Sequence, residues 1–289
     1  MTATRIREIV AAGAAGPAGP EDRVDKVSQL AAQAVRDQPW VKVLEEIGGF
    51  YAFCLEVFKK MFTRRFRFDE FVHQAWFISS VSIGPAIMVS IPFCVVLTFQ
   101  INQILIQIGA VDLAGAGSAV AVIRELGPIV SVLAVAGAGA TAIAADLGAR
   151  TIREEIDAIV TLGIDPIQRL VVPRVVAATL IGMALNALVS IVGLTGGYFF
   201  SVHLQGATPG LFVSDLSLLV GVFDFVIAEI KAAVFGLLAG LTACYLGLKV
   251  KGGPKGVGDA VNQTVVFSFM LLFAANSVIT AIFFQFKDH

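Results

Sequence analysis

Five long apolar segments dominate the sequence and limit the folds open to it. Each is about 20 residues or longer, the length that an α-helix needs to cross the hydrocarbon core of a bilayer. Hydrophobic residues make up 57% of the chain and charged residues only 15%, which lies outside the ordinary range for soluble domains. The sequence therefore predicts an all-α integral membrane protein with five transmembrane helices, at about residues 76–99, 120–147, 167–200, 225–248 and 264–284.

The first two segments contain residues that affect helix shape and packing. Pro85 and Pro92 remove backbone donors from the first segment and should kink or break its helix. Just beyond it, Gln100 and Gln103 carry amides that are unfavourable against lipid tails, so we expect them to face outer water, a cavity or a partner chain. The small residues at 137–140 predict close helix packing in the second segment.

The amino-terminal quarter differs from the rest. Residues 1–40 are rich in Ala, Gly and Pro and predict a flexible cytoplasmic extension. In residues 41–74, aromatic and apolar residues recur at helical spacing opposite Lys59, Lys60 and a basic cluster at 64–67. This pattern is typical of an amphipathic helix in the inner membrane interface, with its basic side toward anionic head groups. A soluble helix packed on another subunit is the alternative.

A polar island at residues 145–174 separates the second and third segments. Thr151 and Glu154 have the spacing of a helix-starting capping box, and Gly163 supplies a stop, so a short helix is predicted at about 151–162. Its Ile156 and Asp157 fall on different faces, one apolar and one acidic. Such a helix is too short and too charged to cross a bilayer, so it should lie on the membrane surface. The alternative is a solvated linker between spans.

Several motifs together resemble the MlaE/YrbE permeases, the membrane subunits of lipid-moving ABC transporters that work with MCE proteins. They are RELGP at 124–128, REEIDAI at 153–159, LGIDPIQRLVVPR at 162–174, EIKAAVFGLLAG at 229–240 and CYLGLKVKGGPKGVGDA at 244–260. The likeness covers about residues 71–284. It implies that the short acidic helix is a cytoplasmic coupling helix that docks on the ATPase. The contact residues would be Arg153, Glu154, Glu155, Asp157, Ile159 and Leu162.

The distribution of basic residues predicts the orientation. With the amino terminus inside, 18 of the 21 Lys and Arg residues fall on the inner side, at 1–74, 146–174 and 249–255. Because cytoplasmic loops carry an excess of Lys and Arg, this places the amino terminus in the cytoplasm and the carboxyl terminus outside. An even number of spans would put the lysines at 249–255 on the wrong side. We expect a multi-pass protein of the plasma membrane.

Charges inside the apolar segments are candidates for contact with a substrate. Arg124 and Glu125 open the second segment, and Lys231 lies near the start of the fourth, where isolated charges are unfavourable unless they are paired or hydrated. The resemblance implies that these residues border a lipid cavity, and relatives often carry an acid where this chain has Asn276. The predicted cavity set is Arg124, Glu125, Lys231, Gln100, Gln103 and Asn276. Alternatively, Arg124 and Lys231 extend to the interface and are neutralised by Glu125 and Glu229.

Enzyme motifs are largely missing from the sequence. It has no G-x-x-x-x-G-K-[ST], HExxH or GxSxG motif, so we predict no catalytic or metal-binding residues and no cofactor on this chain, with ATP and Mg²⁺ on a separate ATPase. The string at 256–259 reads G-x-G-D, as in intramembrane aspartyl proteases, but Asp224, the nearest other aspartate, is predicted at the opposite side of the membrane. The three cysteines lack metal-ligand spacing and predict reduced packing residues.

The resemblance also implies partners. A chain of this kind would pair with a second YrbE-type permease, a paralogue in a heterodimer, and with an ABC ATPase dimer, MCE proteins and membrane lipids, but with no nucleic acid. The polar extension and the FRFDEF segment at 66–71 look most similar to actinobacterial, mycobacterial-type YrbE proteins of Mce import systems. That likeness implies fatty acids, mycolic acids or sterols as cargo. An ion-coupled secondary transporter and, more remotely, the aspartyl protease remain alternatives.

Overall fold

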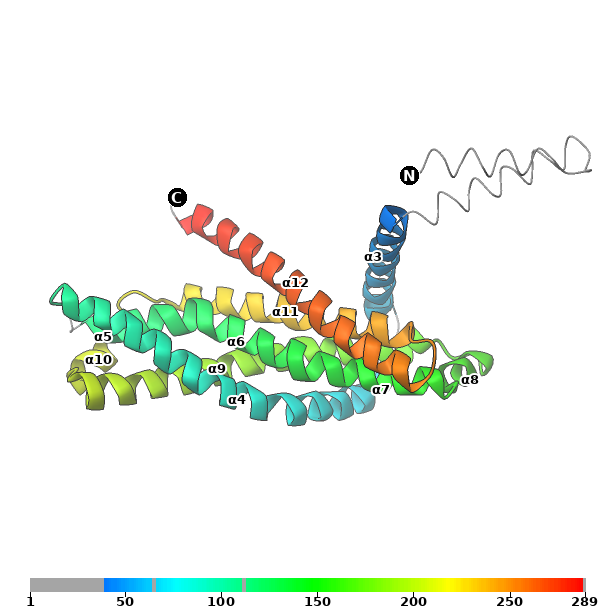
Figure 1. Cartoon of the computed structure of the whole chain (residues 1–289), viewed down its shortest axis with the longest axis horizontal. Coiled ribbons are helices and arrows are strands. Elements are labelled where there is room, and N and C mark those ends of the chain that lie inside the picture. The colour runs from blue at the N-terminus through cyan, green and yellow to red at the C-terminus, as the bar shows by residue number, and fades with distance from the viewer. Residues whose placement is uncertain (1–38, 64–65, 111–112, 288–289) are drawn as a thin grey trace, which may run out of the picture. The chain divides into compact units, whose positions relative to one another are not determined.

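The computed structural model describes residues 39–63, 66–110 and 113–287, and every regular element in these ranges is helical (Figure 1). The all-α prediction is therefore confirmed for the described part of the chain. The predicted extension at 1–40 lies almost wholly outside it. The elements are α3 (Pro39–Thr63), α4 (Phe68–Gln107), α5 (Ala114–Ala119), η2 (Val120–Leu126), α6 (Gly127–Ala134), η3 (Val135–Ala140), α7 (Thr141–Ile152), α8 (Glu155–Thr161), η4 (Ile167–Val171), α9 (Val172–Gln205), α10 (Pro209–Asp215), α11 (Val222–Leu248) and α12 (Pro254–Lys287).

The chain divides into two units, residues Met1–Glu56 and Val57–His289. Helix α3 ends at Thr63 and α4 begins at Phe68, so the segment 41–74 contains two helices where the sequence pattern predicted one. The position of α3 in a membrane interface stays a prediction. The remaining helices belong to the second unit, in which α8 lies at one end and α5 and α10 at the other (Figure 1). We call these the α8 end and the α10 end.

Four helical stretches within the described residues are long and apolar enough to cross a membrane: Phe68–Gln107, Ala114–Ile152, Ile167–Gln205 and Pro254–Phe283. They coincide with four of the five predicted spans. Helix α11, which covers the predicted span at 225–248, is not among them, so the count of five is not confirmed. It carries Asp224, Glu229 and Lys231 in its first half and packs between α7, α9 and α12.

Helix α4 buries one residue in every four, from Gln74 to Asn102, and most of these side chains are small or polar. A repeat of four exceeds the 3.6 residues of a helical turn, so the buried stripe winds around α4 and the helix must cross its neighbour α9 at an angle. A Cβ on Gly193 of α9 would lie only 2.7 Å from Cys94 Sγ, so glycine permits this approach. Helix α4 continues unbroken through Pro85 and Pro92.

Two π-helical turns interrupt the stretch from Ala114 to Ile152, at η2 and η3. A π-turn widens the helix by one residue and leaves carbonyl groups without their usual partners. Pro128, the second residue after η2, has no N–H to donate to the carbonyl of Arg124, its α-helical acceptor. The local sequence thus removes the α-helical donor of one carbonyl in this stretch.

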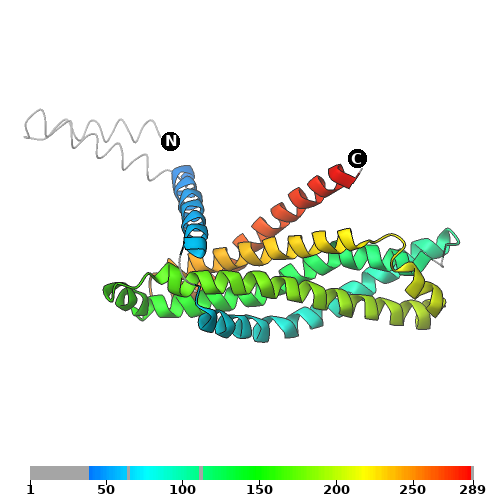
Figure 2. The same cartoon turned by 180° about the vertical axis from the view of Figure 1, so that it is seen from behind.

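Helix α12 separates from the other helices along its carboxyl-terminal half, as both views show (Figures 1 and 2). Phe273, Val278 and Ile282 of this half are exposed. Phe283 still reaches the bundle, and its ring centroid lies 6.1 Å from that of Phe223 at the start of α11.

Candidate functional site

Charged side chains meet an apolar rim near the α10 end of the bundle. They line a hollow of about 270 Å³, a volume that includes open solvent. The lining residues come from η2, α11 and α12 and are Arg124, Glu125, Asp224, Ile227, Ala228, Lys231 and Phe283. The sequence interpretation brought Arg124, Glu125 and Lys231 together from the second and fourth segments, and the structure places them in one hollow.

Two groups near the start of α11 bind the side chain of Arg124. Its Nε lies 2.9 Å from Asp224 Oδ1, and its Nη2 donates to the Leu219 carbonyl at 2.8 Å. Asp224 is 7% exposed, and its Oδ2 accepts a hydrogen bond from the Gly221 N–H at 3.0 Å. Asp224 therefore caps the first turn of α11 and fixes the guanidinium at the same time.

Lys231 is the most deeply buried cation of the hollow, with 3% of its surface exposed. Its Nζ donates to the Arg124 carbonyl at 3.4 Å, a group whose α-helical donor position is occupied by Pro128. Its acidic neighbour is Glu125, whose Oε1 lies 3.6 Å away and whose side chain is 43% exposed. Lys231 thus has a loosely held counter-ion, in contrast to the close, buried pair of Arg124.

A second polar contact joins α9 to α11 beside this hollow. Asn186 of α9 is fully buried, and its Nδ2 donates to Glu229 Oε1 at 3.0 Å. A Cβ on Gly127 would lie 2.8 Å from both Asn186 Oδ1 and Ser190 Oγ, so glycine lets α6 approach these polar atoms. Polar side chains of α9 and α11 therefore meet within apolar sequence, where a glycine of α6 approaches them.

The other predicted cavity residues lie elsewhere. Gln100 and Gln103 are exposed on α4, and Asn276 is half-buried on α12, outside the lining of the hollow. The buried amide at the end of α4 is Asn102, whose Nδ2 donates to Ser201 Oγ at 2.7 Å. The alternative in which both cations extend to the interface does not describe Lys231, which stays buried.

Asp224 is the lining residue that the sequence interpretation did not assign to the site. It placed this aspartate at the outer side without giving it a role. The available signal was an acidic residue in the first turn of an apolar helix, directly after Gly221, where a carboxylate is favoured by free N–H groups. Asp224 lies in the first turn of α11 and Asp259 in the second turn of α12, past the opposite end of α11, and the part of α11 that follows Asp224 rises about 36 Å at 1.5 Å per residue. This distance excludes an aspartyl-protease pair made of the two.

The short helix of the polar island begins later than its capping box predicted. Helix α7 continues through Thr151 to Ile152, and α8 begins at Glu155 with no side-chain cap. The Thr151 hydroxyl instead donates to the carbonyls of Leu147 and Gly247. Glu154 separates the helices with a φ of 59°, a left-handed conformation that is unfavourable for a residue with a Cβ. The predicted start was wrong because α7 continues through Thr151, whose hydroxyl bonds to Leu147 of its own helix and to Gly247 of α11.

The predicted stop of this helix is confirmed. Gly163 adopts a φ of 73°, and the Ile164 N–H donates to the Ile159 carbonyl at 3.1 Å, as at many helix ends that close on glycine. Beyond it, Asp165 Oδ2 lies 2.6 Å from Lys60 Nζ. Burial raises the pKa of Asp165, but Lys60 and the N–H groups of Ile167 and Gln168 outweigh it and hold this pKa below its usual value.

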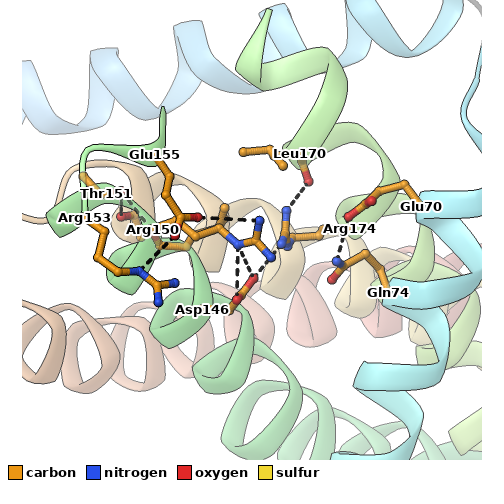
Figure 3. Close-up of polar contacts among 11 residues, drawn as sticks. Glu70, Gln74, Asp146, Arg150, Thr151, Arg153, Glu155, Leu170 and Arg174 are labelled. Carbon is orange, nitrogen blue, oxygen red and sulfur yellow. Dashed lines mark hydrogen bonds and ion pairs between the residues drawn. The ribbon is translucent and has the colours of Figure 1, made fainter. Parts of the chain in front are cut away.

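The exposed face of α8 carries acidic and apolar side chains together. Of the residues predicted to contact an ATPase, Arg153, Glu154, Asp157 and Leu162 are exposed, whereas Glu155 and Ile159 are half-buried. Leu162 is 76% exposed, and Arg153 Nε pairs with Glu155 Oε1 at 3.0 Å (Figure 3). Val160, two residues before Leu162, is also exposed, so two apolar side chains lie beside the acids on this surface.

Comparisons with known proteins agree with this architecture. The family described as Permease MlaE matches residues 71–282. The chain is 33% identical over 190 residues to the probable ABC transporter permease protein slr1045 of Synechocystis, covering 66% of this chain and 72% of that protein. It is 29% identical to a probable ABC transporter permease protein of Rickettsia bellii, covering 85% and 95%. It is also 31% identical to Protein TRIGALACTOSYLDIACYLGLYCEROL 1, chloroplastic, of Arabidopsis thaliana, covering 71% and 58%.

Proposed function

Since the chain belongs to the MlaE permease family, we propose that it is a permease subunit that moves an anionic lipid in an ATP-driven transporter of the plasma membrane. The observation that carries this proposal is the buried ammonium of Lys231, 3% exposed, in a hollow that is also lined by Phe283. A charge at such depth is unfavourable without a function, and the apolar rim suits an acyl chain.

The loose pairing of Lys231 with its counter-ion supports the binding of a lipid with an anionic head group. Arg124 has a counter-ion at 2.9 Å that is almost fully buried, whereas the counter-ion of Lys231 is 3.6 Å away and 43% exposed. A carboxylate or phosphate of the lipid would replace Glu125 at the ammonium, and Glu125 would turn into the solvent. The hydrogen bond of Lys231 to the Arg124 carbonyl does not depend on Glu125, so it would hold the ammonium in place during the exchange.

At the other end, α8 is proposed to be the cytoplasmic coupling helix. Its exposed acids and Leu162 would dock on one subunit of an ABC ATPase dimer, which binds ATP and Mg²⁺. A second permease, a paralogue, would cover the exposed apolar half of α12 and dock on the other ATPase subunit. Closure of the ATPase dimer would then move both coupling helices.

The finer identity follows from the sequence resemblance. We place the chain in an actinobacterial, mycobacterial-type Mce system, with the amino terminus in the cytoplasm and the α10 end toward external MCE proteins. The cargo would be a fatty acid, a mycolic acid or a sterol carrying an acidic group. Helix α11 is proposed as the fifth span, because it runs between the two ends of the bundle.

The coupling role is tested by the double variant Glu154→Lys/Asp157→Lys. We expect the ATPase to stop copurifying and lipid uptake to cease while the protein remains in the membrane, because both acids lie on the exposed face of α8. The control Glu45→Lys/Glu46→Lys reverses two charges on α3 and should retain the ATPase. Uptake that persists without the ATPase would favour an ion-coupled secondary transporter.

The substrate role is tested by Lys231→Ala and Arg124→Ala in the assembled complex. Transport of a fluorescent fatty acid should fall roughly tenfold or more, because a hydrogen bond to a charged group contributes about 1.5–3 kcal/mol. Lys255→Ala removes an exposed lysine at the opposite end of α11 and should leave transport unchanged. Unchanged transport in Lys231→Ala with assembly intact would overturn the assignment of the hollow.

A further inference from the structure

A buried arginine lies at the α8 end, in the part of the bundle farthest from the charged hollow. Arg174 of α9 has 0% of its side chain exposed, and its Nη2 lies 2.6 Å from Asp146 Oδ2 of α7 (Figure 3). Its Nη1 donates to the Leu170 carbonyl at 2.9 Å, and its Nε has no hydrogen-bond partner. A buried guanidinium is strongly destabilising when its partner is removed, so Asp146 ties α7 to α9.

The Asp146 carboxylate is also the start of a series of ion pairs that leads toward α8. Asp146 also pairs with Arg150 Nε at 3.3 Å, and Arg150 Nη1 lies 4.0 Å from Glu155 Oε2, at the first residue of α8 (Figure 3). Arg153 pairs with Glu155 from the other side at 3.0 Å. The ion pairs thus form a continuous series from α8 through α7 to the interior of α9.

The series crosses a joint in the backbone. Glu154 is the one non-glycine residue in the described ranges with a positive φ, and it separates the axes of α7 and α8. At such a joint the chain alone transmits a displacement poorly, because a few dihedral angles can absorb it. Arg150 and Arg153 bridge the joint through Glu155, and Thr151 ties α7 to the Gly247 carbonyl of α11 at 3.1 Å.

We propose that Asp146 and Arg174 are positioning residues that transmit the displacement of α8 into the span α9. The inference rests on the proposed function, because it presumes that a partner ATPase moves α8. It adds to that function a specific mechanical link, in which Arg150 passes the movement to Asp146 and Asp146 passes it to Arg174. Loss of the link should separate ATP hydrolysis from transport, since neither site itself is altered.

The experiment uses the complete transporter in proteoliposomes, with ATP hydrolysis and transport of a fluorescent fatty acid measured in parallel. Asp146→Asn should keep hydrolysis within about twofold of the wild type and lower transport roughly tenfold. The exchange Asp146→Arg/Arg174→Asp should recover part of the transport, because it restores an ion pair. Lys255→Gln, an exposed charge at the same end, should change neither rate.

Arg150→Gln keeps the test decisive if Asp146→Asn does not fold, because Arg150 is one-third exposed and its loss strands no buried charge. It should show the same split between hydrolysis and transport. A proportional fall of both rates in these variants would overturn the link and leave the proposed function standing. A wild-type complex that hydrolyses ATP but moves no lipid would overturn both.

Discussion

Replacing Gly236 of α11 by alanine should loosen the contact between α11 and α9. A Cβ at this position would lie 2.4 Å from the Ala178 carbonyl oxygen and 2.9 Å from the Thr179 Cα, whereas ordinary contact begins at 3.4 Å. The atoms in the way are backbone, so α9 and α11 must separate by about 1 Å. Overpacking of this kind costs about 1–3 kcal/mol, of which the better helix propensity of alanine offsets up to about 1 kcal/mol.

Separation of α9 and α11 should also lengthen the polar contact between them near the hollow. Asn186 Nδ2 and Glu229 Oε1 lie 3.0 Å apart across the same two helices, and a further 1 Å or so would carry them beyond hydrogen-bond distance. We expect the unfolding temperature of the purified protein in detergent to fall by roughly 2–8 °C. The measurement is the fraction that stays monodisperse by size-exclusion chromatography after stepwise heating.

The matched control is Gly258→Ala in the first turns of α12. A Cβ at Gly258 meets nothing within 4 Å, so this variant should be unchanged or slightly more stable through helix propensity alone. If Gly236→Ala were as stable as Gly258→Ala, α9 and α11 would not pack as closely as described, and the geometry of the hollow would lose its support.

Three further predictions concern the α8 end and α3. Asp165 has a lowered pKa, so its pair with Lys60 stabilises the fold fully above the unfolded pKa near 3.8, and this stabilisation is lost as the pH falls through the folded pKa. Asp165→Asn should therefore lower the unfolding temperature more at pH 7 than near pH 3, and an equal loss at both would contradict the ion pair. Glu154→Gly should stabilise the protein by about 1 kcal/mol by relieving its positive φ, whereas Asp157→Gly, inside α8, should destabilise it. Burial raises the pKa of Cys54 to about 11, so labelling by maleimide at pH 7.5 should be far slower in the folded than in the denatured protein, with comparable rates counting against burial.

The span helices could be predicted from sequence because apolar length is a local property. The prediction of helix at about 76–99 marks the apolar core of α4, while the helix itself runs from Phe68 to Gln107, since polar residues continue it at both ends. The predicted stop at Gly163 held for the same local reason, a glycine that adopts a positive φ. Of the kink or break predicted at Pro85 and Pro92, the break does not occur, since α4 runs through both prolines without interruption.

Apart from the grouping of Arg124, Glu125 and Lys231, contacts between distant residues escaped the sequence interpretation. The capping box at Thr151 failed in part because Gly247, in a different helix, accepts the hydroxyl. Asp224 and Arg124 are 100 residues apart, and Arg174 and Asp146 are 28 apart, so no local pattern pairs them. What the sequence does show is a charge within an apolar stretch, which indicates a buried partner without identifying it.

A glycine contact between α9 and α11 lies between the two charged ends of the bundle. Gly236 lies in α11 between Glu229, which binds Asn186 of α9, and Gly247, which binds Thr151 of α7. Because backbone packs against backbone at Gly236, α9 and α11 have no side chains between them that could yield and absorb a shift there. Displacement of one end of this pair must therefore appear at the other as a tilt about the glycine contact. We expect this packing of small residues to couple the ion pairs at the α8 end to the charged hollow at the α10 end.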